Sequence, residues 1–137
     1  MIKVKALTAK SFAKYGEVIE ARQALGFHVL FGEPGKVGWR LAYSKVKQKP
    51  LNRIEAHPDS METFEPVSGV CVMVVAAPAT PDKIEAFILD KGVCIKKNTW
   101  HELIVLSADA ELKLVENYDI QGTKYHTFKK PLDVYVG

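Results

Sequence analysis

Apolar and polar positions alternate in short blocks along most of this chain. From Glu17 onward, segments rich in Val, Ile, Phe and Tyr are separated by turn-forming residues. Blocks of this length and composition predict β-strands rather than helices. The predicted strands cover residues 18–20, 27–31, 39–47, 53–57, 63–67, 70–76, 84–89, 93–95, 103–106 and 112–117.

One segment near the start predicts a helix. Thr8 is suited to cap a helix over residues 9–15, and Gly16 stands where a left-handed residue commonly ends one. No alternating βα pattern follows, so the chain is expected to be mainly β, a small antiparallel sandwich or barrel with a short N-terminal helix. No linker or repeat divides residues 1–137, which predicts a single domain. Residues 122–137 are expected to fold back along the barrel or to cover a subunit contact.

Composition and charge argue against several classes of partner. With 47% hydrophobic and 26% charged residues, the chain has the composition of an ordinary soluble globular protein. Its formal charge of +3 comes from scattered lysines, so nucleic acid is not an expected partner. The longest apolar run, residues 70–78, is too short to span a membrane, and the N-terminus lacks the apolar core of a signal peptide. We therefore expect a cytoplasmic protein in which Cys71 and Cys94, both within apolar stretches, are free thiols.

Four polar side chains are predicted to converge. Glu55 and His57 are two positions apart on one predicted strand and so share a face. A turn at residues 58–60 would return the chain and bring Glu62 beside them on the neighbouring strand, while His101 begins a later strand. Two imidazoles and two carboxylates suit a divalent first-row metal such as Ni, Mn, Fe or Zn. The alternative is a set of half-buried polar groups satisfied by hydrogen bonds in a barrel mouth.

The spacing of these residues resembles the motifs of the cupin superfamily. The first cupin motif runs His-x-His, four residues, Glu, six residues, Gly; Glu55, His57, Glu62 and Gly69 occupy those places, with Glu55 replacing the first histidine. Gly69 is expected to close the hairpin that Glu62 begins. His101 corresponds to the final histidine of the second cupin motif. The resemblance implies a small antiparallel cupin (jelly-roll) β-barrel.

Within the cupins, the chain resembles the ureidoglycolate lyase family, also called ureidoglycolate hydrolases, over most of its length. Similar segments are Leu7-Thr8, residues 12–20, Phe27-His28, Glu55-x-His57-Pro58, Phe64-x-Pro66, Gly69, residues 72–76, Pro81-Asp82, residues 86–88, Gly92-Val93 and Asn98-x-Trp100-His101. The chain departs from the family at Leu30, where the family carries Asn, and at Glu102, where the family carries a second histidine. Both departures are expected to touch the pocket. Lys45 stands for a family arginine.

The resemblance implies a carbon–nitrogen lyase that releases urea from ureidoglycolate and leaves glyoxylate, in the allantoin branch of purine catabolism. Its implied catalytic residues are Glu62, His101 and His57, with Glu62 as the preferred base. Its implied substrate-binding residues are His28, Tyr43, Lys45 and Trp100. A divalent metal would be held by Glu55, His57, Glu62 and His101. A homodimer is also implied, since small barrels often cover exposed edges by pairing.

Two other functions stay open on the sequence. One is a different metal-dependent cupin enzyme, an isomerase or dioxygenase acting on a small oxygenated acid or sugar, which Leu30 and Glu102 favour. The other is a cupin that binds a small ligand without catalysis, because one fold carries many functions.

Overall fold

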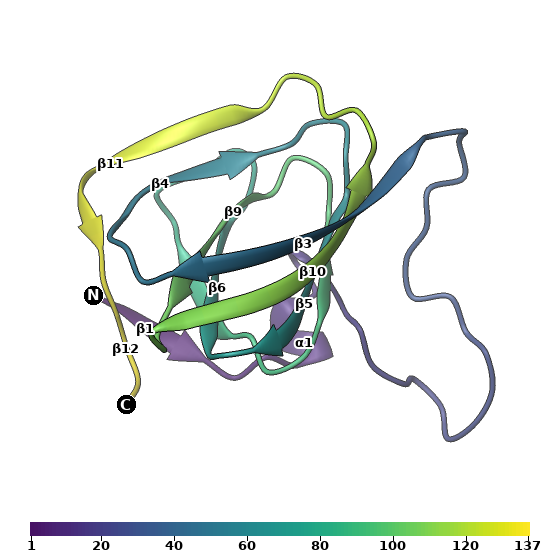
Figure 1. Ribbon diagram of the computed structural model, residues 1–137, viewed down its shortest axis with the longest axis horizontal. Helices are drawn as coiled ribbons and strands as arrows, with labels where there is room; N and C mark the ends of the chain where they lie inside the picture. Colours follow the sequence, from purple (N-terminus) through teal and green to yellow (C-terminus); the bar gives the residue numbers. More distant parts are fainter.

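The computed structural model describes residues 1–137, and its regular secondary structure is almost entirely β-strand, in two sheets (Figure 1). The first sheet has seven strands in the order β11-β4-β9-β6-β7-β1-β12. Their bounds are β1 Ile2–Lys5, β4 Leu51–Ala56, β6 Cys71–Ala76, β7 Glu85–Ile88, β9 Trp100–Val105, β11 Lys124–Leu132 and β12 Val134–Tyr135. The second sheet has five strands in the order β2-β8-β5-β10-β3. Their bounds are β2 Gly16–Val18, β3 Trp39–Lys47, β5 Glu62–Ser68, β8 Val93–Ile95 and β10 Asp109–Asn117.

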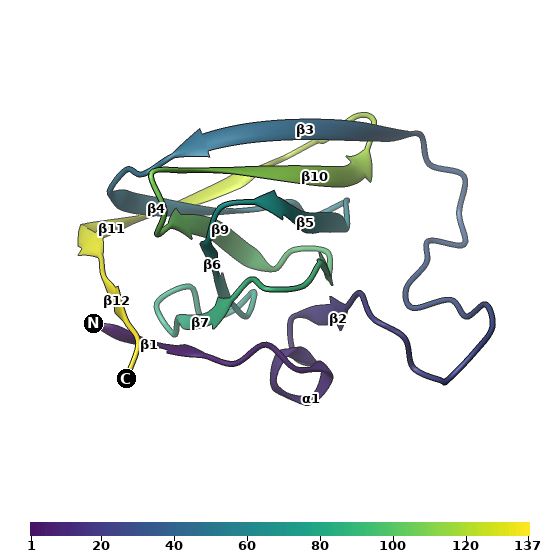
Figure 2. The same ribbon diagram turned by 60° about the horizontal axis from the view of Figure 1, so that its bottom comes forward.

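The main core lies between the two sheets and takes residues from both. In Figure 2, β3, β10 and β5 lie at the top, and β7 and β1 lie below them. The strands alternate, so that Phe64 of β5 and Leu112 of β10 meet Met73 and Val75 of β6 in one buried cluster. Phe12 and Tyr15 close the end of this cluster and pack edge-on against Phe87. The predicted mainly β barrel is confirmed.

A second core lies on the other face of the seven-stranded sheet. All six residues of β6 are buried, because Val72, Val74 and Ala76 point away from the main core into this second cluster. β11 and β12 stand at opposite ends of the sheet order, yet only Asp133 separates them along the chain. The tail thus wraps this face, and Phe128, Leu132 and Val134 pack against the second cluster. Residues 122–137 therefore fold back along the barrel, one of the two predicted outcomes.

The helix is shorter than predicted. α1 covers Ala9–Phe12, with Thr8 as its N-cap in a reciprocal capping box with Ser11. Gly16 does not end the helix in a left-handed conformation, which is a correction to the prediction. It begins β2, where a Cβ atom would lie 2.0 Å from the carbonyl oxygen of Cys94, so that close strand approach explains the glycine.

Several strand predictions need correction. Residues 27–31 form no strand, because they lie in the long excursion between β2 and β3 that projects from the body in Figure 1. β1, β11 and β12 were not predicted, and β1 pairs in parallel with both β7 and β12. Gly69, with φ 80°, does not close a hairpin, since β5 and β6 belong to different sheets. No helix is long and apolar enough to cross a membrane.

Candidate active site

Three elements bring the predicted cluster together. Glu55 of β4 and His101 of β9 are direct partners in the seven-stranded sheet. His57 follows β4, and the chain then crosses to the other sheet, where Glu62 begins β5. Glu62 was predicted on a strand beside Glu55, but it faces Glu55 from the opposite sheet. The four residues are nevertheless close together, at one end of the space between the sheets.

The crossover that positions Glu62 is fixed by hydrogen bonds to β10. The amide of Asn117 donates to the hydroxyl oxygen of Ser60, 2.9 Å away, and the Asn117 side chain donates to the Asp59 carbonyl at 2.9 Å. The predicted turn at residues 58–60 is present, and Asn98, with φ 64°, forms the predicted turn before His101. The amide of Asn98 donates to the His57 carbonyl at 2.8 Å, which joins the two turns.

The carboxylate oxygens and imidazole nitrogens of the cluster lie close enough together to bind one metal ion. Oε1 of Glu62 lies 3.3 Å from Nε2 of His57 and 3.1 Å from Nε2 of His101. Oε1 of Glu55 lies 3.7 Å from each of the same two nitrogens. His57, Glu62 and His101 are buried, whereas Glu55 is partly exposed and marks the open side of the cluster.

The outer nitrogens of both imidazoles are held by hydrogen bonds. Nδ1 of His101 lies 2.9 Å from the carbonyl oxygen of Thr99, which can only accept, so Nδ1 carries a proton and Nε2 faces the cluster. Nδ1 of His57 lies 3.0 Å from the Thr123 hydroxyl. Hydrogen bonds of this kind fix ring orientation in metal-binding histidines.

Burial and charge act in opposite directions on these groups. Burial alone would raise the pKa of Glu62, but hydrogen bonds and positive charge from His101 and His57 lower it to about 2. Burial would lower the pKa of His101, yet Glu62 raises it above its ordinary value. In the absence of a metal ion, the ionised Glu62 therefore favours the protonated form of His101.

Glu116 and Arg40 extend the cluster, and neither was predicted. The carboxylate of Glu116 lies within 4.8 Å of ligand atoms of His57 and Glu62. Arg40 is its direct partner across β3 and β10, with Nη2 2.6 Å from Oε2. Burial and the charge of Glu62 raise the pKa of Glu116. The sequence contained a signal for Glu116, because alternation along residues 112–117 puts its side chain on the same face as the apolar Leu112 and Leu114.

The residues of the cluster fit a divalent metal. Oε1 of Glu62 and Nε2 of His101 are buried without a hydrogen-bond partner of good geometry, although both point into the same small space. Two overlapping triads, Glu55-His57-His101 and His57-Glu62-Glu116, each place their ligand atoms within 4.8 Å. Nitrogen and carboxylate donors in this ratio suit the ions predicted from the sequence.

Three of the predicted substrate-binding residues lie on β3 and β9 but point away from the cluster. Tyr43 and Lys45 lie on the outward face of β3, where the Tyr43 hydroxyl donates to Glu111 at 3.1 Å and Lys45 approaches Asp109 at 4.0 Å. Trp100 precedes His101 on β9 and so points to the opposite face, where it belongs to the second core. Its indole N–H donates to the Pro78 carbonyl at 3.0 Å, so Trp100 does not form the expected wall of the cluster.

The remaining predicted residues line two other hollows. His28 and Leu30 border an apolar hollow together with Thr63 and Cys94, which are partners on β5 and β8. Thr63 alternates with Glu62, so this hollow lies on the outer side of the sheet. Glu102 lines a polar hollow beside β4. Neither of the two departures from the family, Leu30 and Glu102, therefore borders the Glu62 cluster directly.

Solved structures with a similar fold include nucleotide-sugar isomerases. A dTDP sugar isomerase from Desulfovibrio desulfuricans G20 is 14% identical, with a TM-score of 0.54, over 85% of this chain and 83% of that one. The WlaRB TDP-quinovose 3,4-ketoisomerase from Campylobacter jejuni is 24% identical, with a TM-score of 0.50, over 61% and 67% of the two chains. At these identities the likeness concerns the fold alone.

Sequence relatives give a more specific result. The ureidoglycolate lyase of Rhizobium leguminosarum bv. trifolii is 29% identical over 91% of this chain and 89% of the relative. Ureidoglycolate lyase 2 of Rhizobium meliloti is 27% identical over 96% and 95%. The family model for ureidoglycolate lyase matches residues 31–135, which include β3 to β12 and all six residues of the cluster. The chain belongs to the ureidoglycolate lyase family.

Proposed function

We propose that this protein cleaves ureidoglycolate into urea and glyoxylate and that the Glu62 cluster is where it does so. The observation that carries the proposal is the convergence of Glu62 with two buried imidazoles in a chain of this family. This is the enzyme class that the sequence predicted, a carbon–nitrogen lyase.

The reaction requires a base and a group that protonates the leaving nitrogen. Ureidoglycolate is a carbinol-urea, so removal of its hydroxyl proton lets a carbonyl form while the carbon–nitrogen bond breaks and urea departs with a proton. Glu62 is ionised and so able to accept a proton. His101, whose pKa is raised, is the group suited to return it to the departing nitrogen.

Arg40 supports a substrate that carries a carboxylate. Its guanidinium contacts Glu116 of the cluster and remains partly exposed. A planar guanidinium binds carboxylates with paired hydrogen bonds. We propose that Arg40, rather than Tyr43 or Lys45, receives the carboxylate of ureidoglycolate in this arrangement.

A divalent metal fits the same residues. Glu55, His57, Glu62 and His101 would hold it, with Glu116 as a further carboxylate. Such an ion would polarise the substrate hydroxyl and lower the cost of its ionisation. Elemental analysis of the purified protein would identify the bound ion.

The proposal is tested by measuring urea and glyoxylate release by the purified protein, alone and with added Ni, Mn, Fe or Zn. We expect both products in equal amounts, and loss of at least 99% of the activity in His101→Ala. The matched control is His126→Ala, since His126 contacts Asp82 on the surface. Absence of turnover with every ion would overturn the lyase proposal, and would favour another cupin reaction or a binding role.

We further propose a homodimer that acts in the cytoplasm. β3 ends the five-stranded sheet, so its outer edge has no partner strand. Its outward face carries Trp39, Leu41 and Tyr43, which are 69%, 64% and 58% exposed. A row of exposed apolar side chains on a free edge supports pairing with a second copy. The cytoplasmic location stays a prediction from the sequence.

A further inference from the structure

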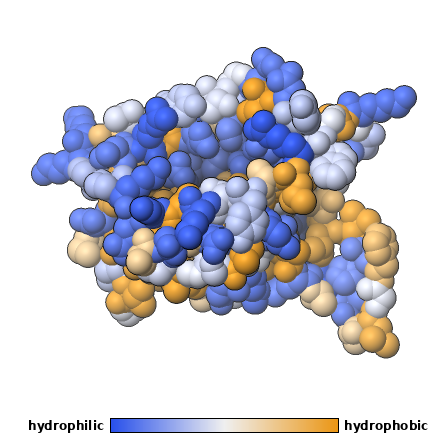
Figure 3. Space-filling view, in the orientation of Figure 1, coloured by the Kyte–Doolittle hydropathy of each residue, from blue (hydrophilic) through white to orange (hydrophobic).

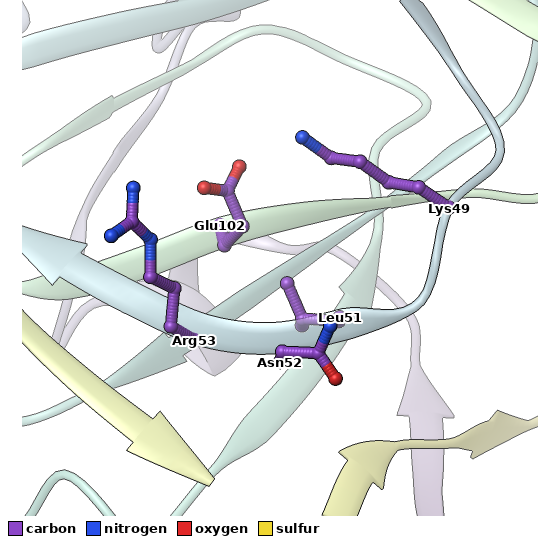
Figure 4. Close-up of a pocket in the computed structure, with 5 residues that line it drawn as sticks. All are labelled: Lys49, Leu51, Asn52, Arg53 and Glu102. Atoms are coloured by element: carbon purple, nitrogen blue, oxygen red, sulfur yellow. The ribbon is translucent and has the colours of Figure 1, made fainter.

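A polar hollow lies apart from the Glu62 cluster, between β4, β9 and the turn that follows β3. Its volume is about 330 Å³, and its walls are formed by Lys49, Leu51, Asn52, Arg53 and Glu102. None of these residues belongs to the Glu62 cluster. In Figure 4, the head groups of Lys49 and Arg53 approach from two sides, with the carboxylate of Glu102 between them. The volume is at the small end of the range for small-molecule sites.

The hollow exists because two neighbouring strands separate. The register of β4 and β9 contains one pair of partners, Glu55 and His101. Past that pair, the amide of Leu103 donates to Oε1 of Glu102 at 3.0 Å. On the other side of β4, the register with β11 shifts between Thr127 and Leu132. Bulges and gaps of this kind are typical beside functional sites.

The three charges that line the hollow are not neutralised by one another. No ion pair of the chain involves Lys49, Arg53 or Glu102. The guanidinium of Arg53 is fixed by stacking, 4.2 Å from the centre of the Tyr125 ring, which leaves its N–H edge free. Two cations and one carboxylate thus surround one small space with unused hydrogen-bonding capacity.

We propose that this hollow binds a small dicarboxylate that carries one ammonium group, as an acidic amino acid does. The two carboxylates would be received by Lys49 and Arg53, and the ammonium by Glu102. The side chains contribute a net charge of +1, which the net charge of −1 on such a ligand balances. A simple anion would leave Glu102 unpaired, so the carboxylate selects for the ammonium group.

The site is tested by calorimetric titration of the purified protein with L-aspartate, succinate and glycine. We expect L-aspartate to bind at least fivefold more tightly than succinate, which lacks the ammonium, or glycine, which lacks the second carboxylate. Lys49→Ala and Arg53→Ala should each weaken aspartate binding at least fivefold. The matched control is Lys113→Ala, an exposed lysine on the outer face of the five-stranded sheet.

The decisive variant is Glu102→Gln. It retains an oxygen for the Leu103 amide, so the fold should be preserved, which a thermal melt checks. We expect this variant to reverse the preference, so that succinate binds more tightly than aspartate. A merely structural role of Glu102 would weaken both ligands equally and would overturn the proposal.

The result is independent of the proposed lyase activity, because binding rather than turnover is measured. Glu62→Gln should leave the binding of aspartate unchanged. If that variant abolishes aspartate binding while Lys49→Ala does not, the ligand occupies the Glu62 cluster and the second site does not exist. Failure of all three ligands to bind the wild-type protein at millimolar concentration would also overturn it.

Discussion

At the scale of single residues, the space between Glu62 and His101 can hold either a proton or a metal ion. Oε1 of Glu62 and Nε2 of His101 are 3.1 Å apart, and each is buried. Nδ1 of His101 is already committed to the Thr99 carbonyl. Only Nε2 can therefore exchange its proton for a metal, and the two states must compete.

Competition with a proton predicts that metal binding strengthens as pH rises. Burial lowers the pKa of His101, but Glu62 raises it above its ordinary value, so at any pH below that pKa a metal ion must displace the proton from Nε2. For each proton released, affinity should rise about tenfold per pH unit while the pH stays below that pKa. Titrations of the metal-free protein with Ni or Zn between pH 6 and 8 measure this slope. A slope of zero would show that Nε2 is not a ligand.

Two carboxylates in the cluster are predicted to contribute differently to catalysis. Glu62, with a pKa of about 2, is ionised and contacts both imidazoles, whereas the pKa of Glu116 is raised by burial and by the charge of Glu62. We expect Glu62→Gln to reduce kcat by 100-fold or more, a typical contribution of a general base. Glu116→Gln should reduce it less and should also raise KM, because Arg40 loses its partner. Equal losses of kcat in both variants, with KM unchanged, would contradict this division.

At the scale of secondary-structure elements, β2 and β8 must approach more closely than most side chains allow. A Cβ atom at position 16 would lie 2.0 Å from the Cys94 carbonyl oxygen, and backbone cannot move aside as a flexible side chain does. We expect Gly16→Ala to lower the free energy of unfolding by about 1–3 kcal/mol, the usual cost of overpacking. Urea denaturation measures the change. Gly35→Ala, where a Cβ meets nothing within 4 Å, is the matched control and should change stability little.

Strands with a clear local pattern of apolar and polar residues could be predicted from the sequence. Strands that depend on pairing with segments far away in the sequence could not. Residues 39–47 and 93–95 alternate or are bounded by turns, and both predictions agree with β3 and β8. Residues 27–31 have an equally apolar pattern, yet no neighbouring strand pairs with them, and Phe27 is 91% exposed. β1 and β12 stabilise each other through parallel pairing across almost the whole chain, for which a local pattern gives no signal.

At the scale of the whole molecule, the candidate site also depends on contacts between distant segments that local sequence patterns do not predict. Glu55 and His57 could be grouped because they are two positions apart in an extended segment, and His101 because its motif spacing is recognisable. The position of Glu62 was predicted for the wrong reason, since a hairpin was expected where the chain crosses between sheets. Arg40 joins the cluster only through the pairing of β3 with β10, which sequence spacing does not determine.

The free edge and the exposed face of β3 predict self-association of the whole molecule. Apolar side chains also gather on the excursion over residues 19–38, at the lower right of Figure 3. Leu25, Phe27 and Val29 are exposed there, so the excursion carries a second exposed apolar surface besides that of β3. An apolar surface of this kind is costly to leave in water and is typical of an interface.

We therefore expect a dimer in sedimentation-velocity experiments at micromolar concentration and a shift to monomer in Leu41→Glu. A charge at this position would be desolvated on association while its partner strand offers no compensating group in the apolar row. Val136→Glu is the matched control, since Val136 is 76% exposed near the C-terminus, away from β3. A dimer that persists in Leu41→Glu and dissociates in Val136→Glu would move the interface to the β1–β12 edge. Because Arg40 belongs to β3 and pairs with Glu116 on β10, dissociation should also lower lyase activity per chain. Unchanged activity would show that the interface does not support the site.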